Sequence, residues 1–155
     1  MRAWYDILGA DIAKREDEAG LRKSQVSVEK LIAREVARGT PASRIILAGF
    51  SQGCAMTLQT GLRHPERLAG LLCLSGYVPL SEVTAAERHP ANQNTPIFIA
   101  HGRGDPVIPI QRAEQSRDLL TSLGYPLEWH EYPMQHSVCT EEIDDIGAWF
   151  KRVLA

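Results

Sequence analysis

A serine stands between two glycines in the run Gly49-Phe50-Ser51-Gln52-Gly53, which fits the pattern G-x-S-x-G. This pattern forms a sharp turn between a strand and a helix, and the turn exposes the serine hydroxyl at the end of the strand. The glycines are expected because so tight a turn strains the backbone and brings neighbouring segments close together. The spacing therefore predicts a nucleophilic Ser51. A serine that only caps the N-terminus of a helix is the simpler alternative.

A serine hydroxyl is a weak nucleophile until a neighbouring base takes its proton. On a sheet of this kind the acid and then the base follow the serine along the chain, each in a loop after a strand. Asp105 in HGRGDP and His136 in YPMQHS occupy such positions. We predict that His136 is the base, that Asp105 orients its ring, and that the backbone N–H of Gln52 stabilises an oxyanion. The alternatives are a turn aspartate at 105 and a solvated loop histidine at 136.

Short apolar runs that fit buried strands alternate with stretches of helical periodicity. Strands are expected at 44–50, 68–74, 97–101 and 127–132, and helices at 24–38, 52–64, 110–123 and 140–154, the last with Thr140 as its N-cap. We expect an extended or loop segment at 1–20 and a long surface excursion at 77–95. This alternation predicts one domain over residues 1–155, an α/β fold with a mostly parallel sheet in three layers.

The composition excludes several classes of protein. A net charge of −2 leaves no basic excess for phosphates, so nucleic acid is not an expected partner. No apolar run approaches the roughly 18 residues of a membrane span, and the N-terminus lacks the apolar core of a secretory signal. Three cysteines in isolated or apolar contexts fit free thiols in a reducing compartment. We therefore predict a cytoplasmic protein without stable membrane insertion. The remaining histidines do not have metal-ligand spacing, so no metal is expected.

Four stretches of the sequence, GFSQGCAM, LSGYVP, HGRGDPVIP and YPMQHSVCTEEI, together with MRAWYDI at the start, carry a family resemblance. In order and spacing they resemble the bacterial carboxylesterase and acyl-protein thioesterase family, also called the phospholipase/carboxylesterase family. The resemblance implies a three-layer α/β-hydrolase-like fold with Ser51, Asp105 and His136 as the catalytic triad. It also implies hydrolysis of small-molecule or acyl-protein esters and thioesters through an acyl-enzyme intermediate, without a metal or an organic cofactor.

The sequence departs from this family at its N-terminal side. Family members carry a further N-terminal third with several strands and an H-G-L-G-D type loop that supplies a second oxyanion donor, and nothing in residues 1–44 matches it. We therefore expect a truncated sheet, about four parallel strands and four helices, from a start at an internal Met or a natural truncation. The strand at 44–50 would then have an open edge, through which the chain could form a homo-oligomer.

The same departure leaves a second reading of the function open. A truncated domain with an incomplete oxyanion site would be a catalytically weak binding or interaction module, or a gene fragment. His101 is expected to be a structural strand-end histidine, and Cys139 a structural thiol rather than the partner of His136.

Overall fold

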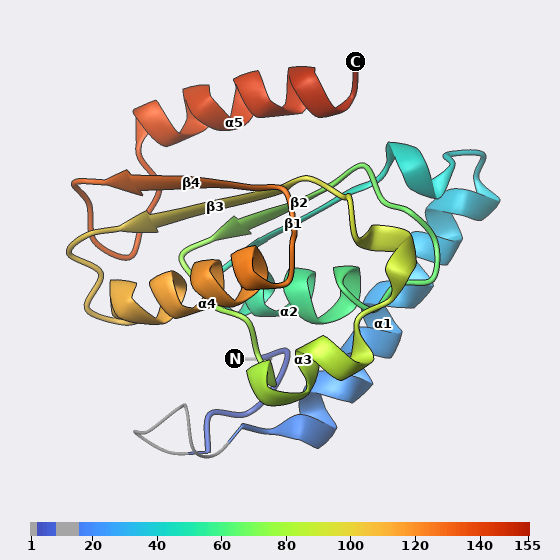
Figure 1. Cartoon of the computed structure of the whole chain (residues 1–155), viewed down its shortest axis with the longest axis horizontal. Coiled ribbons are helices and arrows are strands. Elements are labelled where there is room, and N and C mark those ends of the chain that lie inside the picture. The colour runs from blue at the N-terminus through green and yellow to red at the C-terminus, as the bar shows by residue number, and fades with distance from the viewer. Residues whose placement is uncertain (1–2, 9–15) are drawn as a thin grey trace.

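The computed structural model describes residues 3–8 and 16–155. Four strands, β1 (Ile46–Phe50), β2 (Gly70–Leu74), β3 (Ile97–Gly102) and β4 (Leu127–Tyr132), form one sheet in the order β1-β2-β3-β4 (Figure 1). All neighbouring strands are parallel. The predicted number and direction of the strands are confirmed, and each observed strand lies within one residue of, or inside, its expected range.

The helices lie on both faces of the sheet (Figure 1). Their bounds are α1 (Glu18–Ala37), α2 (Gln52–Gly61), α3 (Ser81–Glu87), α4 (Ile110–Ser122) and α5 (Thr140–Val153). Of the described helices, α5 alone covers one face, whereas α2 and α4 cover the other and α1 packs against α2. The three predicted layers are therefore present.

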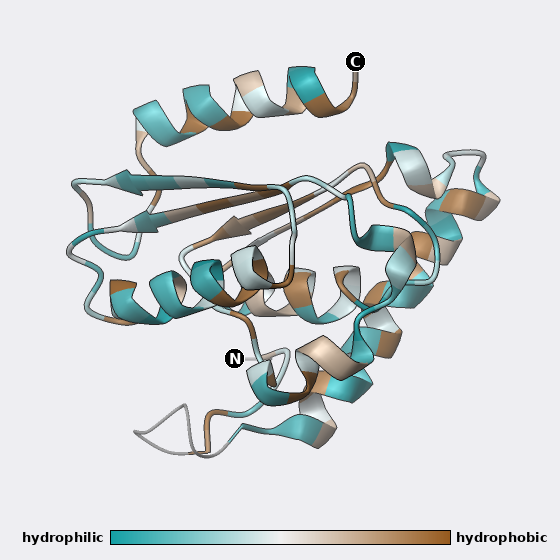
Figure 2. Ribbon diagram, in the orientation of Figure 1, coloured by the Kyte–Doolittle hydropathy of each residue, from teal (hydrophilic) through white to brown (hydrophobic). Residues whose placement is uncertain are grey.

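Burial follows from this arrangement. The central strands β2 and β3 have helices on both faces and are buried almost throughout, whereas β1 and β4 at the edges are partly exposed. On the α5 side Trp149 and Ile146 pack against Phe98 of β3. The apolar stripe of α5 faces the sheet and its polar side faces outward, as Figure 2 shows. Apolar strands with covered faces are typical of parallel sheets.

Two helical assignments differ from the expectation. Helix α1 begins at Glu18 rather than near residue 24, because the side chain of Asp17 caps it by accepting a hydrogen bond from the Gly20 N–H at 2.9 Å. Residues 18–20 are therefore helical rather than extended, while 1–2 and 9–15 of the predicted N-terminal segment lie outside the described residues. At the other end of the chain Cys139, not Thr140, is the N-cap of α5.

The segment expected to be a surface excursion contains a helix that was not predicted, α3. It has only seven residues, too few for its periodicity to be recognised. The excursion is also held firmly. The buried side chain of Asn92 accepts from the Leu68 N–H at 2.9 Å and donates to the carbonyls of His64 and Glu66. It therefore ties this segment to the connection that leads into β2.

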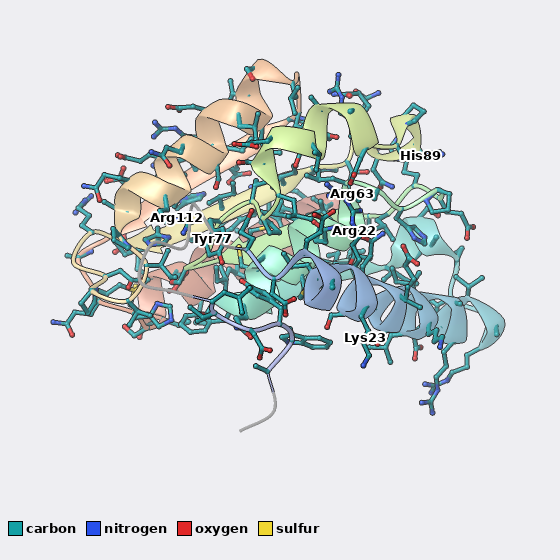
Figure 3. All side chains as sticks on the ribbon, turned by 90° about the horizontal axis from the view of Figure 1, so that it is seen from below. Arg22, Lys23, Arg63, Tyr77, His89 and Arg112 are labelled. Atoms are coloured by element: carbon teal, nitrogen blue, oxygen red, sulfur yellow. The ribbon has the colours of Figure 1, made fainter. Side chains whose placement is uncertain are left out.

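The N-terminal residues 3–8 are anchored on α1 and α2 by one buried side chain, that of Tyr5. Tyr5 is buried among Leu21, Ala55 and Met56, and its hydroxyl lies 2.8 Å from the hydroxyl of Tyr77. The guanidinium of Arg112 lies 3.9 Å from the centre of the Tyr77 ring, and both side chains are labelled in Figure 3. Within the described part of the chain, none of the helices has the length and apolar character needed to cross a membrane.

Candidate active site

Ser51 occupies the turn between β1 and α2 in an unusual backbone conformation. Its φ is 57° and its ψ is −117°, a region that residues other than glycine rarely adopt. The turn is anchored by the Ser51 N–H, which donates to the carbonyl of Leu74 on β2 at 2.8 Å. Strain of this kind persists only where the surrounding structure enforces it, and it clusters at functional sites.

The two glycines of the motif have different roles. A Cβ atom on Gly49 would lie 2.0 Å from the backbone of Gly53, so only glycine allows the strand and the helix to approach this closely. A Cβ atom on Gly53 would meet no atom within 4 Å. The expected crowding is therefore present at Gly49 and absent at Gly53.

The side chains of Ser51, His136 and Asp105 form one chain of hydrogen bonds. His136 Nε2 lies 3.1 Å from Ser51 Oγ, and His136 Nδ1 lies 2.7 Å from Asp105 Oδ2. A carboxylate can only accept, so Nδ1 carries the proton and Nε2 is free to accept from the serine hydroxyl. The structure thus brings together the three residues singled out from the sequence, although they are up to 85 positions apart.

Asp105 is buried, and its carboxylate is fully satisfied. Oδ1 accepts from the backbone N–H groups of Val107 and Ile108 at 2.8 and 2.9 Å, while Oδ2 accepts from His136. Burial by itself raises the pKa of this carboxyl, but the hydrogen bonds from His136, Ile108 and Val107 together hold its pKa below the ordinary value. Asp105 is therefore an anion at neutral pH.

The loop that carries His136 is held against the loop that carries Asp105. The N–H of Arg103 donates to the carbonyl of Tyr132 at 2.9 Å, and the N–H of Gly104 donates to the carbonyl of Met134 at 3.1 Å. A Cβ atom on Gly102 would lie 2.4 Å or less from the carbonyls of Met134 and Gln135. Glycine at 102 thus permits the two loops to meet.

Two contacts at this site were not predicted. The ring of Phe50 lies 4.7 Å, centre to centre, from the ring of His136, and Phe50 is 39% exposed. The side chain of Gln52 accepts from the Trp4 N–H at 3.2 Å and donates to the Tyr5 carbonyl at 3.0 Å. The motif draws attention to both positions, but nothing in the sequence indicates what their side chains contact.

The backbone N–H of Gln52, the predicted oxyanion donor, belongs to the first residue of α2. The first N–H groups of a helix have no helical carbonyl to bond. This N–H is therefore available to a negatively charged oxygen near Ser51. In the described ranges, no three His, Cys, Asp or Glu side chains are grouped in the manner of a metal site.

Comparison with known proteins gives consistent matches over almost the whole chain. Residues 1–154 match the sequence profile of the phospholipase/carboxylesterase family. Acyl-protein thioesterase 1 of Neurospora crassa is 44% identical over 94% of this chain and 63% of its own length. Acyl-protein thioesterase 1 of Yarrowia lipolytica is 40% identical over 97% of this chain and 68% of its own length. The bacterial part of the resemblance stays a prediction.

Solved structures share the fold. The crystal structure of SOBER1 from Arabidopsis thaliana covers 100% of this chain and superimposes with a TM-score of 0.92 at 30% identity, over 75% of its own chain. The crystal structure of esterase PE8 covers 97% of this chain and 70% of its own, with a TM-score of 0.85 at 29% identity. The chain thus spans about two thirds of the length of its curated relatives and three quarters or less of these structures.

Proposed function

This chain belongs to the phospholipase/carboxylesterase family, and we propose that it is a serine hydrolase that cleaves carboxylic esters or thioesters. The observation that supports this proposal most directly is the chain of hydrogen bonds from Ser51 through His136 to Asp105. The names of the relatives, acyl-protein thioesterase and esterase, favour an acyl substrate. Small-molecule and acyl-protein substrates both suit these residues, since the fold and the three side chains do not define the acyl pocket.

The proposed reaction begins with attack of Ser51 Oγ on the carbonyl carbon of the substrate. His136 Nε2 takes the hydroxyl proton as the new C–O bond forms, and the negative charge moves to the carbonyl oxygen. The N–H of Gln52 stabilises that oxygen, and the Asp105 carboxylate stabilises the imidazolium through Nδ1. Collapse of the tetrahedral intermediate breaks the bond to the leaving group. The alcohol or thiol leaves with the proton from His136, and the acyl group stays on Ser51.

Water completes the cycle by the same route in reverse. His136 removes a proton from water while the water oxygen attacks the acyl carbon. Collapse then returns the proton to Ser51 Oγ and releases the carboxylic acid. Each step uses only side chains and backbone groups of this chain together with water, so the proposal requires no metal or organic cofactor. A cytoplasmic location is part of the same proposal.

Labelling with a fluorophosphonate probe tests this proposal without knowledge of the natural substrate. The probe reacts covalently with an activated serine, so the folded chain is expected to become labelled in a time-dependent manner. Ser51→Ala is expected to abolish labelling, because the nucleophile is removed. Ser122→Ala is the matched control and should label like the unaltered chain, because this serine is exposed at the end of α4.

Labelling that persists in Ser51→Ala would contradict Ser51 as the nucleophile. A folded chain that takes up no probe would favour the second candidate, a domain of this fold that binds a partner without hydrolysing it. Circular dichroism of each sample separates an unreactive fold from an unfolded chain.

A further inference from the structure

A second histidine, besides His136, lies close to the carboxylate of Asp105. His101 is on β3 and is completely buried. Its Nε2 atom lies 2.8 Å from the carbonyl oxygen of Ile108 and 3.4 Å from Asp105 Oδ2, the same oxygen that accepts from His136. Asp105 Oδ2 thus lies between the imidazole rings of two histidines.

The partners of His101 define its protonation. A backbone carbonyl can only accept, so Nε2 must carry a proton to make the bond to Ile108. The other ring nitrogen, Nδ1, is buried and has no hydrogen-bond partner in the described part of the chain. The Nε2–H of His101 is therefore directed toward the Ile108 carbonyl. Asp105 Oδ2 lies in close contact with Nε2 at 3.4 Å, so it contributes through proximity rather than through a hydrogen bond.

The same N–H closes a ring of interactions around the acid loop. Asp105 Oδ1 holds the N–H groups of Val107 and Ile108, and the carbonyl of Ile108 is in turn held by His101. Because β3 is the most fully buried strand of the sheet, His101 is a rigid anchor for the turn from residue 105 to residue 108.

We propose that His101 is a positioning residue that holds the Ile108 carbonyl, thereby fixes the turn whose N–H groups bind Asp105, and so sets the orientation of His136. The inference deepens the proposed function and rests on it. His101 touches neither Ser51 nor a substrate, and it acts only through Asp105. Without the His101 N–H, the turn at 105–108 keeps the hydrogen bonds from Val107 and Ile108 to Asp105 but loses the bond at the Ile108 carbonyl. Asp105 Oδ2 is then no longer fixed at hydrogen-bond distance from His136 Nδ1. A displacement of about 1 Å in such an arrangement can reduce a rate by about 100-fold.

Three variants separate this role from a general effect of burial. His101→Leu keeps an apolar side chain of similar bulk and removes the donor. His101→Gln keeps an N–H that can reach the position of Nε2. His64→Leu is the matched control: His64 is also buried, and neither of its ring nitrogens has a partner in the described residues. If His101→Leu does not fold, His101→Asn replaces it, because the shorter amide cannot reach the Ile108 carbonyl.

Two readouts are measured for each folded variant. The first is the rate constant for fluorophosphonate labelling of Ser51. The second is the far-downfield proton resonance of His136 Nδ1–H in its hydrogen bond to Asp105, assigned by its loss in His136→Gln. We expect His101→Leu to lower the labelling rate about 10- to 100-fold and to remove or broaden the resonance. His101→Gln should restore both to within a few-fold, and His64→Leu should leave both unchanged.

Retention of the resonance and of the labelling rate in His101→Leu would overturn the proposal, as would an equal loss in the Gln and Leu variants. Absence of the resonance from the unaltered chain would also overturn it, because Asp105 would not then hold His136. If no variant takes up the probe, the proposed hydrolase function fails, yet the resonance still decides whether His101 positions Asp105.

Discussion

The imidazole of His136 is held by two contacts of different character. Asp105 fixes Nδ1 through a charge-assisted hydrogen bond of 2.7 Å. Phe50 lies against the ring itself, tilted by 48° at a centroid distance of 4.7 Å. Phe50 is the residue before Ser51, so the strand that leads into Ser51, the proposed nucleophile, also supports the ring of His136, the proposed base. This contact gives a reason for a large, partly exposed aromatic side chain at the end of an edge strand.

Replacement of Phe50 tests this support at the level of one side chain. Phe50→Leu is expected to slow fluorophosphonate labelling about two- to tenfold, because contacts between aromatic rings contribute about 0.5–1.5 kcal/mol. Phe50→Tyr keeps the ring and should label at nearly the normal rate. Equal rates for the Leu and Tyr variants would show that the ring does not support His136.

At the level of elements, one carboxylate joins α1, α3 and the segment that follows α2. Glu87 at the end of α3 accepts from Arg22 of α1 at 2.8 and 3.2 Å and from Arg63, which follows α2, at 2.7 Å. Figure 3 shows Arg22 and Arg63 close together on the same side of the molecule. The side chain of Arg63 is only 6% exposed, so Glu87 neutralises a guanidinium that has little access to water. Hydrogen bonds from Arg22 and then Arg63 lower the pKa of Glu87 to about 2.

The lowered pKa of Glu87 predicts a pH-dependent contribution to stability. This contribution is complete above the ordinary pKa of 4.5 and is lost as the pH falls toward 2, where the folded state takes up the proton. Glu87→Gln should therefore reduce the free energy of unfolding by about 1–3 kcal/mol at neutral pH, since it leaves Arg63 without its counter-ion. The difference from the unaltered chain should shrink toward pH 2.

Urea unfolding at a series of pH values measures this effect. Glu82→Gln is the control, because Glu82 is an exposed residue of the same helix. A constant difference across the pH range would contradict the assignment, as would an equal effect of the two substitutions.

At the level of the whole molecule, the sheet has an open edge. Strand β1 pairs with β2, and no strand among the described residues pairs with its other side. Beside this edge runs a groove of about 360 Å³ lined mainly by apolar side chains of α1, α2 and β1 and by Trp4. Leu31 and Trp4 on its wall are 54% and 42% exposed. No residue of β1 is charged or proline, the usual protections of an edge strand.

An unprotected apolar edge predicts self-association, which remains a proposal for this chain. We expect light scattering to give a mass above that of one chain, rising with protein concentration. Ala48→Lys places a charge at an exposed position in the middle of β1 and should return the mass to that of a single chain. Thr121→Lys, at an exposed position on α4, is the control for added charge. A single-chain mass at high concentration, without any substitution, would contradict self-association through β1.

The amino-acid sequence was enough to predict the alternation of strands and helices and the loops that carry Ser51, Asp105 and His136. The physical reason is that parallel strands end at a common edge, so residues shortly after three such strands lie along the same edge of the sheet. Local signals were weaker at the ends of helices. The cap at Asp17 is a single hydrogen bond, which hydrophobic periodicity does not indicate. Helix α3 has only seven residues, too few for its periodicity to be recognised.

The contacts among the residues of the site could be seen only in the folded chain. Four features could not be predicted from the sequence. They are the strained angles of Ser51, the contact of the Phe50 ring with His136, the hydrogen bonds of the Gln52 side chain to residues 4 and 5, and the approach of both His101 and His136 to the Asp105 carboxylate. Most of these contacts join residues far apart in sequence, and each depends on positions defined to within an ångström. Sequence spacing gives the edge at which a residue lies, whereas its partners depend on how the loops cross above that edge.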